Sequence, residues 1–486
     1  MILLRTHLAE QVVLDTQVKT KLSINKDIFR AYDIRGEIGK DWCLDNDFHE
    51  VFLIGQAIGS QLKKCHSPEI IIGRDGRITS PAIAEQLLKG LLSTGCKVID
   101  LGLTATPVVC FALSHLGIAN SVMVTGSHNP ANHNGIKIVY DLKPLSGSDI
   151  LSLFHTIENS DFSNPSKEGS YHSYKPIIQN YLQAIVQNID LKQSFNIGID
   201  SGNGATSLFS ESLFTKLGCK VSPLYCEVDG TFPNHSPDPT SPENLKSLIK
   251  LVKDNDLDIG IAFDGDGDRV IAVDNNGKIL WPDRILMLLA QDVLKKNPNS
   301  TIVFDVKCSF LLPKVIKQAG GIASMCISGH SILKMEMLRL NAIIGGEFSG
   351  HIVMRDRWSD FDDGPYVAAR LLEVLSNTRL SCSEIFAQIP DSFSTPEQKI
   401  IFDTPKQARQ ALKNFIRLAD FSQGNISLID GLRVDYEDAW GLVRSSNTTA
   451  SLTLRFEANS ERRLKEIQQQ FRHIFLNSDL KQKLPF

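Results

Sequence analysis

The sequence predicts an α/β protein in which three similar domains are followed by a smaller α+β domain. Three observations predict this architecture. The chain has 486 residues, more than one ordinary domain of roughly 100 to 200 residues. A pattern of strand, turn and helix occurs three times, and a different pattern occupies the C-terminal part. We therefore expect roughly three or four domains and a sizeable core.

The repeated pattern is an apolar run, a turn with an aspartate, a helical stretch, a glycine and a second apolar run. Apolar runs that alternate with helical patterns indicate βαβ units, and a glycine after each helix is the expected C-cap. The copies begin at residues 69, 195 and 300, and their turn aspartates are Asp75, Asp200 and Asp305. We expect three similar α/β domains, although the pattern also fits an unrelated α/β protein, since any such protein repeats βαβ units.

The C-terminal segment follows a different plan. Apolar and polar residues alternate from Ala450 to Phe456, which indicates a strand, and a helical pattern of apolar residues follows from about Ser460. Turn-rich stretches near residues 160–175, 274–283 and 390–397 are the expected joints between domains. The boundaries that we predict are an extension at 1–25 and domains at 26–172, 173–278, 279–390 and 391–486.

Composition and charge exclude several classes of protein. The 51 basic and 55 acidic side chains leave a net charge of -4, so no strongly basic surface for nucleic acid is expected. The nine cysteines are scattered and contain no C-x-x-C pair, which is typical of reduced thiols in the cytoplasm. Charged residues interrupt the N-terminal segment, which argues against a signal peptide, and no run approaches the ~20 apolar residues of a membrane span. We expect a cytoplasmic protein with no membrane partner.

Three aspartates follow an apolar strand in the run FDGDGDR. Asp264, Asp266 and Asp268 are spaced by two, so an extended backbone turns their side chains to one face. Carboxylates that close repel one another, and a hard divalent cation is the usual partner, so the run predicts a Mg²⁺ site. An EF-hand is excluded because Arg269 stands where its loop needs glycine. A haloacid-dehalogenase-type phosphatase, whose D-x-D-G motif normally lies near the N-terminus, and a solvated acidic turn are the other interpretations.

The stretch VTGSHNP places a serine hydroxyl directly after another apolar run. Ser127 does not stand on a G-x-S-x-G elbow, because Thr125 replaces the first glycine, so an acyl hydrolase is disfavoured. A serine at a strand end, with a metal site elsewhere, fits the carrier of a phosphoryl group whose charge the metal neutralises. Gly126 would let the backbone approach the phosphate, and His128 and Lys137 are donors within reach. By itself the stretch also fits an ordinary polar turn.

Four motifs together indicate a family. They are TGSHNP at 125–130, DGDGDR at 264–269, GEFSGH at 346–351 and RSSNTT at 444–449. From about residue 29 to its end the chain resembles the α-D-phosphohexomutase superfamily, in particular its bacterial phosphomannomutase/phosphoglucomutase branch. The resemblance implies a heart-shaped protein with mixed sheets and one active site in a central cleft. Each domain would supply one motif, in chain order for the phosphoserine, the metal, the sugar and the substrate's non-reacting phosphate.

The resemblance also implies roles for single residues. Ser127 would carry the phosphoryl group, and the three aspartates would bind Mg²⁺ together with a phosphoserine oxygen. Glu347 and Ser349 would bind two sugar hydroxyls. The non-reacting phosphate would be held by Arg444, Ser446, Asn447 and Thr448. The other residues expected to line the cleft are Tyr32, Arg35, Lys137, Arg269, Arg284, Lys307, His330 and His351.

The activity that the resemblance implies interconverts hexose 1-phosphates and hexose 6-phosphates of mannose and glucose. The phosphoserine would form a hexose 1,6-bisphosphate, which turns end for end before the other phosphate returns to the enzyme. Mg²⁺ would be the cofactor, glucose 1,6-bisphosphate the activator, hexose phosphates the partners, and the protein a monomer.

Proton transfer in this reaction needs a general acid/base. Lys137 is the first candidate, since a lysine among other cations has a lowered pKa, and His351 or His330 is the second. The other residues expected to take part in catalysis are His128, Arg35 and Arg269.

Departures from the family pattern bear on specificity. Phe348 stands where the branch usually has methionine, and Phe310 and Ile327 stand where relatives commonly have arginine and lysine, so two cations should be missing from the cleft rim. Phosphoglucosamine mutases usually read A-S-H-N, G-E-Q-S-G-H and R-x-S-G-T-E at three of the motifs, and these differences favour a mannose and glucose enzyme. A non-catalytic sugar-phosphate binding protein is the remaining alternative. The pathways that the resemblance implies are the supply of GDP-mannose and of polysaccharide precursors.

Overall fold

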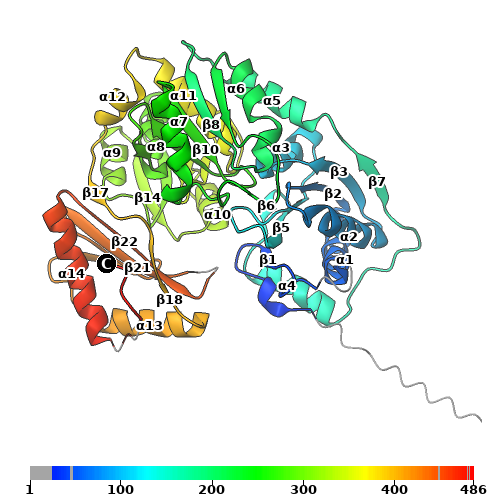
Figure 1. Ribbon diagram of the computed structural model, residues 1–486. Helices are drawn as coiled ribbons and strands as arrows, with labels where there is room; N and C mark the ends of the chain where they lie inside the picture. The colour runs from blue at the N-terminus through cyan, green and yellow to red at the C-terminus, as the bar shows by residue number, and fades with distance from the viewer. Residues whose placement is uncertain (1–23, 44–47, 447–448, 479, 481) are drawn as a thin grey trace, which may run out of the picture.

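Four β-sheets, each with helices against it, follow one another along the chain (Figure 1). The structure is a computed structural model that describes residues 24–43, 48–446, 449–478, 480 and 482–486. Most of the predicted extension 1–25 lies outside the described residues, as do the predicted phosphate ligands Asn447 and Thr448. The first three sheets are mixed and the fourth is antiparallel, which confirms three α/β domains followed by a C-terminal α+β domain.

The first sheet presents the serine motif at the end of a central strand. Its domain contains β1 (Ile34–Glu37), α1 (His49–Lys64), β2 (Glu69–Arg74), α2 (Ser80–Ser93), β3 (Lys97–Leu103), α3 (Thr106–Leu116), β4 (Ser121–Val124), β5 (His133–Tyr140), β6 (Lys143–Pro144), α4 (Ser148–Glu158) and β7 (Ser170–Ser173). The strand order is β1-β5-β4-β2-β3-β7, with β6 beside β5. Three successive isoleucines, Ile70 to Ile72, are buried in β2, because a central parallel strand is covered on both faces.

The second domain carries the aspartate run at the end of its sheet. It contains α5 (Ile177–Asn188), β8 (Asn196–Asp200), α6 (Ser210–Lys216), β9 (Lys220–Leu224), α7 (Lys246–Asp254), β10 (Ile259–Phe263), β11 (Val270–Asp274) and β12 (Ile279–Leu280). The strand order is β12-β11-β10-β8-β9. Every residue of β10 is buried, and the chain leaves this strand at its carboxyl end, where open α/β sheets place their ligand sites.

The third domain has a four-stranded sheet in the order β14-β13-β15-β16. Its elements are α8 (Pro282–Lys296), β13 (Thr301–Asp305), α9 (Leu312–Gln318), β14 (Ile322–Cys326), α10 (His330–Arg339), β15 (Ile344–Gly346), β16 (Ile352–Met354), α11 (Gly364–Ser376) and α12 (Cys382–Ala387). The predicted repeats are therefore β2-α2-β3, β8-α6-β9 and β13-α9-β14. In each repeat the two strands are parallel neighbours, which confirms the repeated βαβ plan.

The fourth domain is an antiparallel sheet with two long helices. It contains β17 (Phe393–Ser394), β18 (Gln398–Ile401), α13 (Pro405–Leu418), β19 (Asn425–Ser427), β20 (Leu432–Asp435), β21 (Ala439–Ser445), β22 (Ser451–Ala458) and α14 (Glu461–Asn477). Leu452, Leu454 and Phe456 alternate along β22 and join the core that α13 and α14 cover. Arg455 and Glu457 on the opposite face are buried as well, because that face packs against the third domain.

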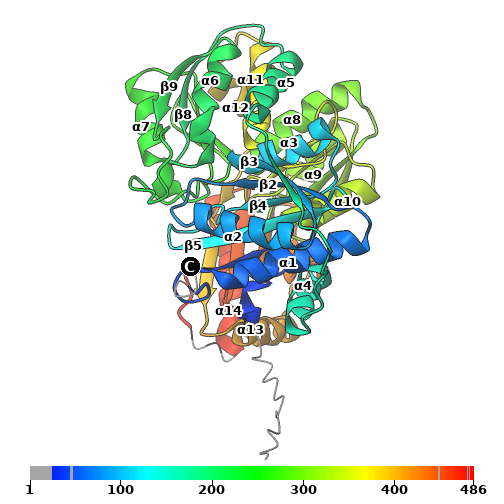
Figure 2. The same ribbon diagram turned by 90° about the vertical axis from the view of Figure 1, so that its right-hand side faces the viewer.

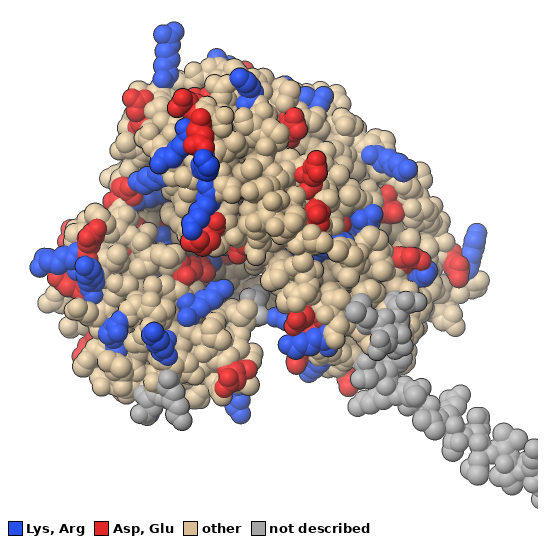
Figure 3. Space-filling model, viewed as in Figure 1, with Lys and Arg blue, Asp and Glu red and all other residues tan. Residues whose placement is uncertain are grey.

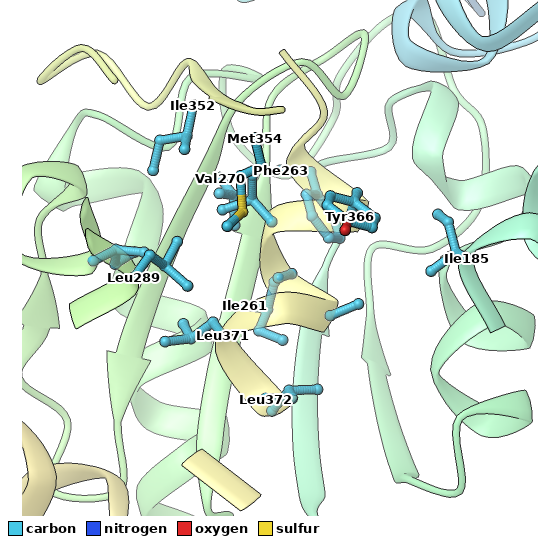
Figure 4. Close-up of a cluster of buried hydrophobic side chains, with 14 of the residues drawn as sticks. Ile185, Ile261, Phe263, Val270, Leu289, Ile352, Met354, Tyr366, Leu371 and Leu372 are labelled. Carbon is cyan, nitrogen blue, oxygen red and sulfur yellow. The ribbon is translucent and has the colours of Figure 1, made fainter. Parts of the chain in front are cut away.

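One apolar core runs through the first three domains, and the first and fourth domains each have a further core of their own. Helix α11 of the third domain contacts β10 and β11 of the second, and Figure 4 shows Tyr366 of this helix beside Phe263. From the first domain, Phe111 on α3 packs edge-on against Tyr181 on α5. Figure 2 shows the resulting order, with α7 and β9 at the top of the molecule and α13 and α14 at the bottom. This shared core therefore fixes the positions of the first three domains relative to one another.

Candidate active site

Ser127 lies in the loop between β4 and β5 and is buried, with 1% of its surface exposed. Its backbone φ is 49°, a left-handed conformation that costs a non-glycine residue roughly 1 to 2 kcal/mol. The amide of Ser127 donates to Thr125 Oγ1 at 2.8 Å, and its hydroxyl donates to Asp264 Oδ2 at 3.1 Å. His128 Nδ1 is 3.2 Å from the same hydroxyl. The serine motif of the first domain therefore meets the aspartate run of the second.

The three aspartates converge beyond the carboxyl end of β10. Ligand oxygens of Asp264, Asp266 and Asp268 lie within 4.8 Å of one another, and all three side chains are buried. Burial and the two neighbouring carboxylates raise the pKa of Asp264. The Oδ1 atoms of Asp266 and Asp268 are buried and have no hydrogen-bond donor among the described residues. Buried carboxylate oxygens without donors suit the hard, oxygen-ligated cations, so these residues fit a divalent metal ion.

Lys137, on β5, lies across the aspartate cluster. Its Nζ atom is 2.7 Å from Asp266 Oδ2 and 2.5 Å from Asp268 Oδ2. Burial alone would lower the pKa of Lys137, but the two carboxylates outweigh burial and raise it. The lowered pKa expected from the sequence is therefore wrong for this arrangement, because the charges next to Lys137 are carboxylates and not cations. Against the opposing effect of burial, Lys137 in turn holds the pKa of Asp266 below its ordinary value.

Two stacked histidines of the third domain face this cluster. The rings of His330 and His351 are 5.2 Å apart between centroids. His351 Nε2 accepts a hydrogen bond from Arg269 Nε at 3.0 Å, and its Nδ1 is 2.6 Å from Asp362 Oδ2. Asp362 also pairs with Lys334. Burial lowers the pKa of His330, so this ring is neutral at pH 7.

One ion pair and one backbone hydrogen bond join the third and fourth domains at the cleft. Lys307 Nζ is 2.7 Å from Glu397 Oε1. Arg444 Nε donates to Asp430 Oδ2 at 2.8 Å, and the same oxygen accepts from the amide of Ser328 at 3.1 Å. Neither Glu397 nor Asp430 belongs to any of the four motifs, so the sequence held no signal for either carboxylate.

The fourth domain also binds the loop that carries Lys307. Arg433 Nη1 donates to the carbonyl oxygens of Val306 at 2.6 Å and Cys308 at 2.8 Å. Arg455 donates to the carbonyl oxygen of Lys307 itself. Two arginines of the antiparallel sheet thus bind three successive carbonyl groups. The sequence motifs gave no indication of this contact.

A cleft of about 490 Å³ is lined by residues from all four domains. Figure 3 shows the molecule hollowed between the fourth domain at lower left and the first domain at lower right. The predicted site residues that line it are Tyr32, Arg35, Ser127, His128, Lys137, Arg269, Lys307, His330, Glu347, Ser349, His351, Arg444 and Ser446. The structure therefore brings together one motif from each domain.

Arg284 lies apart from the residues that line the cleft. Its guanidinium pairs with Asp391 and is 3.2 Å from Ser392 Oγ, in the segment just before β17. Phe310 is buried between the third and fourth domains, where it packs with Trp440. We expected position 310 to lie on the cleft rim, where phenylalanine would leave a positive charge missing. This expectation is wrong, because Phe310 lies in the apolar contact between the third and fourth domains.

The outer surface carries charges of both signs, and basic and acidic side chains are interspersed on the face shown in Figure 3. None of the helices that the structure describes combines the length and the apolar character that crossing a bilayer requires. Each of the nine cysteines, all within the described part of the chain, is a free thiol.

Comparison with known domain families matches the chain in four consecutive segments. Domains I, II and III of the alpha/beta/alpha type of phosphoglucomutase/phosphomannomutase match residues 26–163, 179–277 and 281–393. The C-terminal domain of phosphoglucomutase/phosphomannomutase matches residues 395–474.

Whole-chain relatives agree with these matches. The phosphomannomutase/phosphoglucomutase of Pseudomonas putida is 45% identical over 460 residues, covering 94% of this chain and 97% of that protein. The phosphoglucomutase of Neisseria gonorrhoeae is 43% identical over 453 residues, with 93% and 97% covered. A crystal structure of a phosphoglucomutase/phosphomannomutase family protein from Burkholderia thailandensis superimposes with a TM-score of 0.88 at 39% identity, covering 96% of this chain and 100% of that one. With all four domains matched and the motifs gathered around one cleft, the chain belongs to the bacterial phosphomannomutase/phosphoglucomutase branch of the α-D-phosphohexomutase superfamily.

Proposed function

We propose that the protein interconverts the 1-phosphates and 6-phosphates of mannose and glucose, with Ser127 as carrier of the transferred phosphoryl group. The observation that carries the proposal is the contact of the Ser127 hydroxyl with Asp264 at 3.1 Å, in a cleft lined from every domain. Both sugars are proposed because the Pseudomonas putida relative is named for both activities.

The proposed cycle starts with phosphorylated Ser127 and a hexose 1-phosphate whose 6-hydroxyl faces it. The hydroxyl oxygen attacks phosphorus as the bond to Ser127 Oγ breaks, the hydroxyl proton passes to a base, and Ser127 Oγ takes up a proton, which yields the 1,6-bisphosphate. The bisphosphate turns end for end within the cleft. Ser127 Oγ then gives up its proton and attacks the 1-phosphoryl group, and the departing C1 oxygen takes up a proton. The 6-phosphate leaves, and Ser127 is phosphorylated as at the start.

Each group in the cleft has a proposed part in this cycle. Bound by Asp264, Asp266, Asp268 and an oxygen of phosphorylated Ser127, Mg²⁺ would neutralise charge on the transferred phosphoryl group. Sugar hydroxyls would bind to Glu347 and Ser349, and the other phosphate to Arg444, Ser446, Asn447 and Thr448. The remaining donors and cations proposed to position the substrate are Tyr32, Arg35, His128, Arg269 and Lys307.

Three further features belong to the proposal. Glucose 1,6-bisphosphate would act as activator, because it can return a phosphoryl group to Ser127 after an intermediate has escaped. A monomer is proposed because one chain lines the whole cleft. A cytoplasmic location is proposed because free thiols persist in a reducing compartment.

Lys137 is the proposed general acid/base, with His351 or His330 as the alternative. Replacing Lys137 by alanine is expected to lower kcat for glucose 1-phosphate by about 100-fold or more, the usual contribution of a positioned proton donor. Lys97→Ala is the control, because Lys97 on β3 also pairs with a carboxylate, Glu69, but does not line the cleft. Near-normal turnover of Lys137→Ala would remove the role from this lysine.

The substrate assignment is tested by kcat/KM for the 1-phosphates of mannose, glucose and glucosamine, with Mg²⁺ and a trace of glucose 1,6-bisphosphate. We expect mannose and glucose to lie within about tenfold of each other and glucosamine about 100-fold lower, the range that pocket contacts to a single substituent provide. If glucosamine 1-phosphate were the best substrate, the sugar assignment would be wrong. If no hexose phosphate turned over, a sugar-phosphate binding protein would replace the enzyme.

A further inference from the structure

The geometry points to Arg77 as the residue that holds the Ser127 loop in its reactive position and ties it to the second domain. The inference rests on the proposed role of Ser127. Arg77 stands in the turn after β2, where the sequence pattern indicated only a turn of the repeated unit. Its side chain is fully buried, although arginine is almost never fully buried unless its charge is paired.

The guanidinium of Arg77 binds the backbone of the serine loop through four carbonyl oxygens. Nη2 donates to Ser127 at 2.7 Å and to Asn129 at 2.6 Å. Nη1 donates to Pro130 at 2.6 Å and to His133 at 2.9 Å. One planar group therefore fixes both ends and the middle of the loop, which a lysine ammonium cannot reproduce because it lacks the rigid fork of donors.

A second chain of hydrogen bonds reaches Ser127 from the same turn. Arg77 Nε donates to Asp75 Oδ2 at 3.2 Å, and Thr125 Oγ1 donates to the same oxygen at 2.7 Å. The Thr125 hydroxyl then accepts the amide hydrogen of Ser127 at 2.8 Å. Ser127 keeps its left-handed φ of 49° under these constraints, as strained residues do when the surrounding contacts over-determine them.

Gly126 makes room for the side chain of Arg77. A Cβ atom at this position would lie 2.6 Å from both Cζ and Nε of Arg77, so only glycine lets the guanidinium reach the loop backbone. This contact adds to the approach of a phosphate, which the sequence predicts for the same glycine.

The second domain covers Arg77 from the other side. The guanidinium lies over the ring of Phe232, 4.9 Å from its centroid. A Cβ atom at Gly230 would lie 2.6 Å from the Arg77 Cα, so this segment packs directly on the turn. Because the second domain also carries Asp264, Arg77 sets the serine loop in place relative to the aspartate cluster.

Arg77 is thus a positioning residue and touches no substrate. Misplacing a reacting group by about 1 Å can cost 100-fold in rate, so Arg77→Lys is expected to lower kcat for glucose 1-phosphate about 100-fold. KM should stay within about threefold, because the sugar and phosphate contacts of the third and fourth domains are untouched. Transfer of phosphate from glucose 1,6-bisphosphate to dephosphorylated Ser127, followed by intact mass, should slow by the same factor as kcat.

Arg370→Lys is the matched control. Arg370 is also a buried arginine, held by Asp356 at 2.8 and 2.9 Å, but it lies on α11 away from the cleft. We expect Arg370→Lys to keep kcat within about threefold of wild type at a similar loss of resistance to urea. The inference is overturned if folded Arg77→Lys keeps wild-type kcat, or if Arg370→Lys loses as much kcat as Arg77→Lys does.

Should Arg77→Lys fail to fold, Thr125→Val carries the test, because it removes only the hydroxyl between Asp75 and the Ser127 amide. We expect about a tenfold loss of kcat with little change in KM, as for one buried hydrogen-bond partner left unpaired. Thr94→Val is its control, since this buried hydroxyl binds only outside the cleft, to Leu91 O at 2.7 Å and near Cys96. Wild-type kcat in Thr125→Val would overturn the inference. Absence of turnover in the wild type would instead overturn the proposed function.

Discussion

Replacing Ser127 by alanine is expected to abolish mutase turnover, with a loss of at least about 10⁴-fold in kcat. In the proposed cycle Ser127 Oγ first gives up one phosphoryl group and then accepts another. The TGSHNP motif contains no other serine that could replace it. His128 Nδ1 is 3.2 Å from this hydroxyl. Burial and nearby arginines lower the pKa of the His128 ring, so the ring is neutral, and the contact with Asp264 is made by the Ser127 hydroxyl. Turnover of glucose 1-phosphate with Mg²⁺ and glucose 1,6-bisphosphate is the measurement.

Ser201 provides the control for this substitution. It follows β8 in the second domain, is fully buried, and its hydroxyl is 2.9 Å from that of Ser210. Ser201→Ala removes a buried hydroxyl outside the serine motif and outside the cleft lining, so it should lower the free energy of unfolding by about 1 kcal/mol and leave kcat unchanged. Intact mass should detect a phosphoryl group on wild type and Ser201→Ala and none on Ser127→Ala. Full activity in Ser127→Ala would contradict the phosphoserine cycle.

Replacing Asp266 by asparagine is the second large effect that we expect, with a loss of roughly 10³-fold in kcat/KM at low Mg²⁺. Asp266 Oδ1 is buried and has no donor in the part of the chain that the structure describes, while Oδ2 is 2.5 Å from Thr106 Oγ1, so Oδ1 is the oxygen left for a cation. Asparagine keeps the shape of the side chain, but it has one oxygen where Asp266 has two and it lacks the negative charge. Titration calorimetry with Mg²⁺ should show one ion per wild-type chain and much weaker binding by Asp266→Asn.

The pH dependence of Mg²⁺ binding follows from Asp264. Because burial and its neighbours raise the pKa of this carboxyl, a proton competes with Mg²⁺ there at higher pH than at an ordinary aspartate. The Mg²⁺ affinity of the wild type is therefore expected to fall as the pH is lowered, with a proton released on binding.

Asp274→Asn is the control for the metal site. Asp274 is buried at the end of β11 and accepts from the amides of Asn276 and Lys278 at 2.9 Å, so its loss should lower stability without changing Mg²⁺ affinity. Wild-type Mg²⁺ binding by Asp266→Asn would exclude Asp266 as a ligand.

The predictable part of the site consists of residues that stand in short motifs beside strands. Ser127 follows the apolar run of β4, and Asp264 follows that of β10, so strand periodicity and motif spacing were enough to single them out. The βαβ repeat was predictable for the same reason, since β2, β8 and β13 are local apolar runs that end in an aspartate or just before one.

The unpredicted part consists of residues whose meaning lies in contacts between distant segments. Arg77 reads as a turn residue until its four carbonyl partners, at least 50 positions further along the chain, are in place. Glu397 and Asp430 acquire their role from Lys307 and the amide of Ser328 in the same way.

The sequence by itself determined the fold class, the order of the domains and the four motifs of this protein, because apolar periodicity and motif spacing are local properties of the chain. Only the tertiary structure decided which charges meet. It placed Lys137 next to carboxylates, paired Arg284 with Asp391, and packed the guanidinium of Arg77 against Gly126. The physical reason is that the pKa and the partner of a buried charge depend on the nearest opposite charge in space. For Lys137 that charge comes from the second domain, and for Arg284 it lies 107 residues further along the chain.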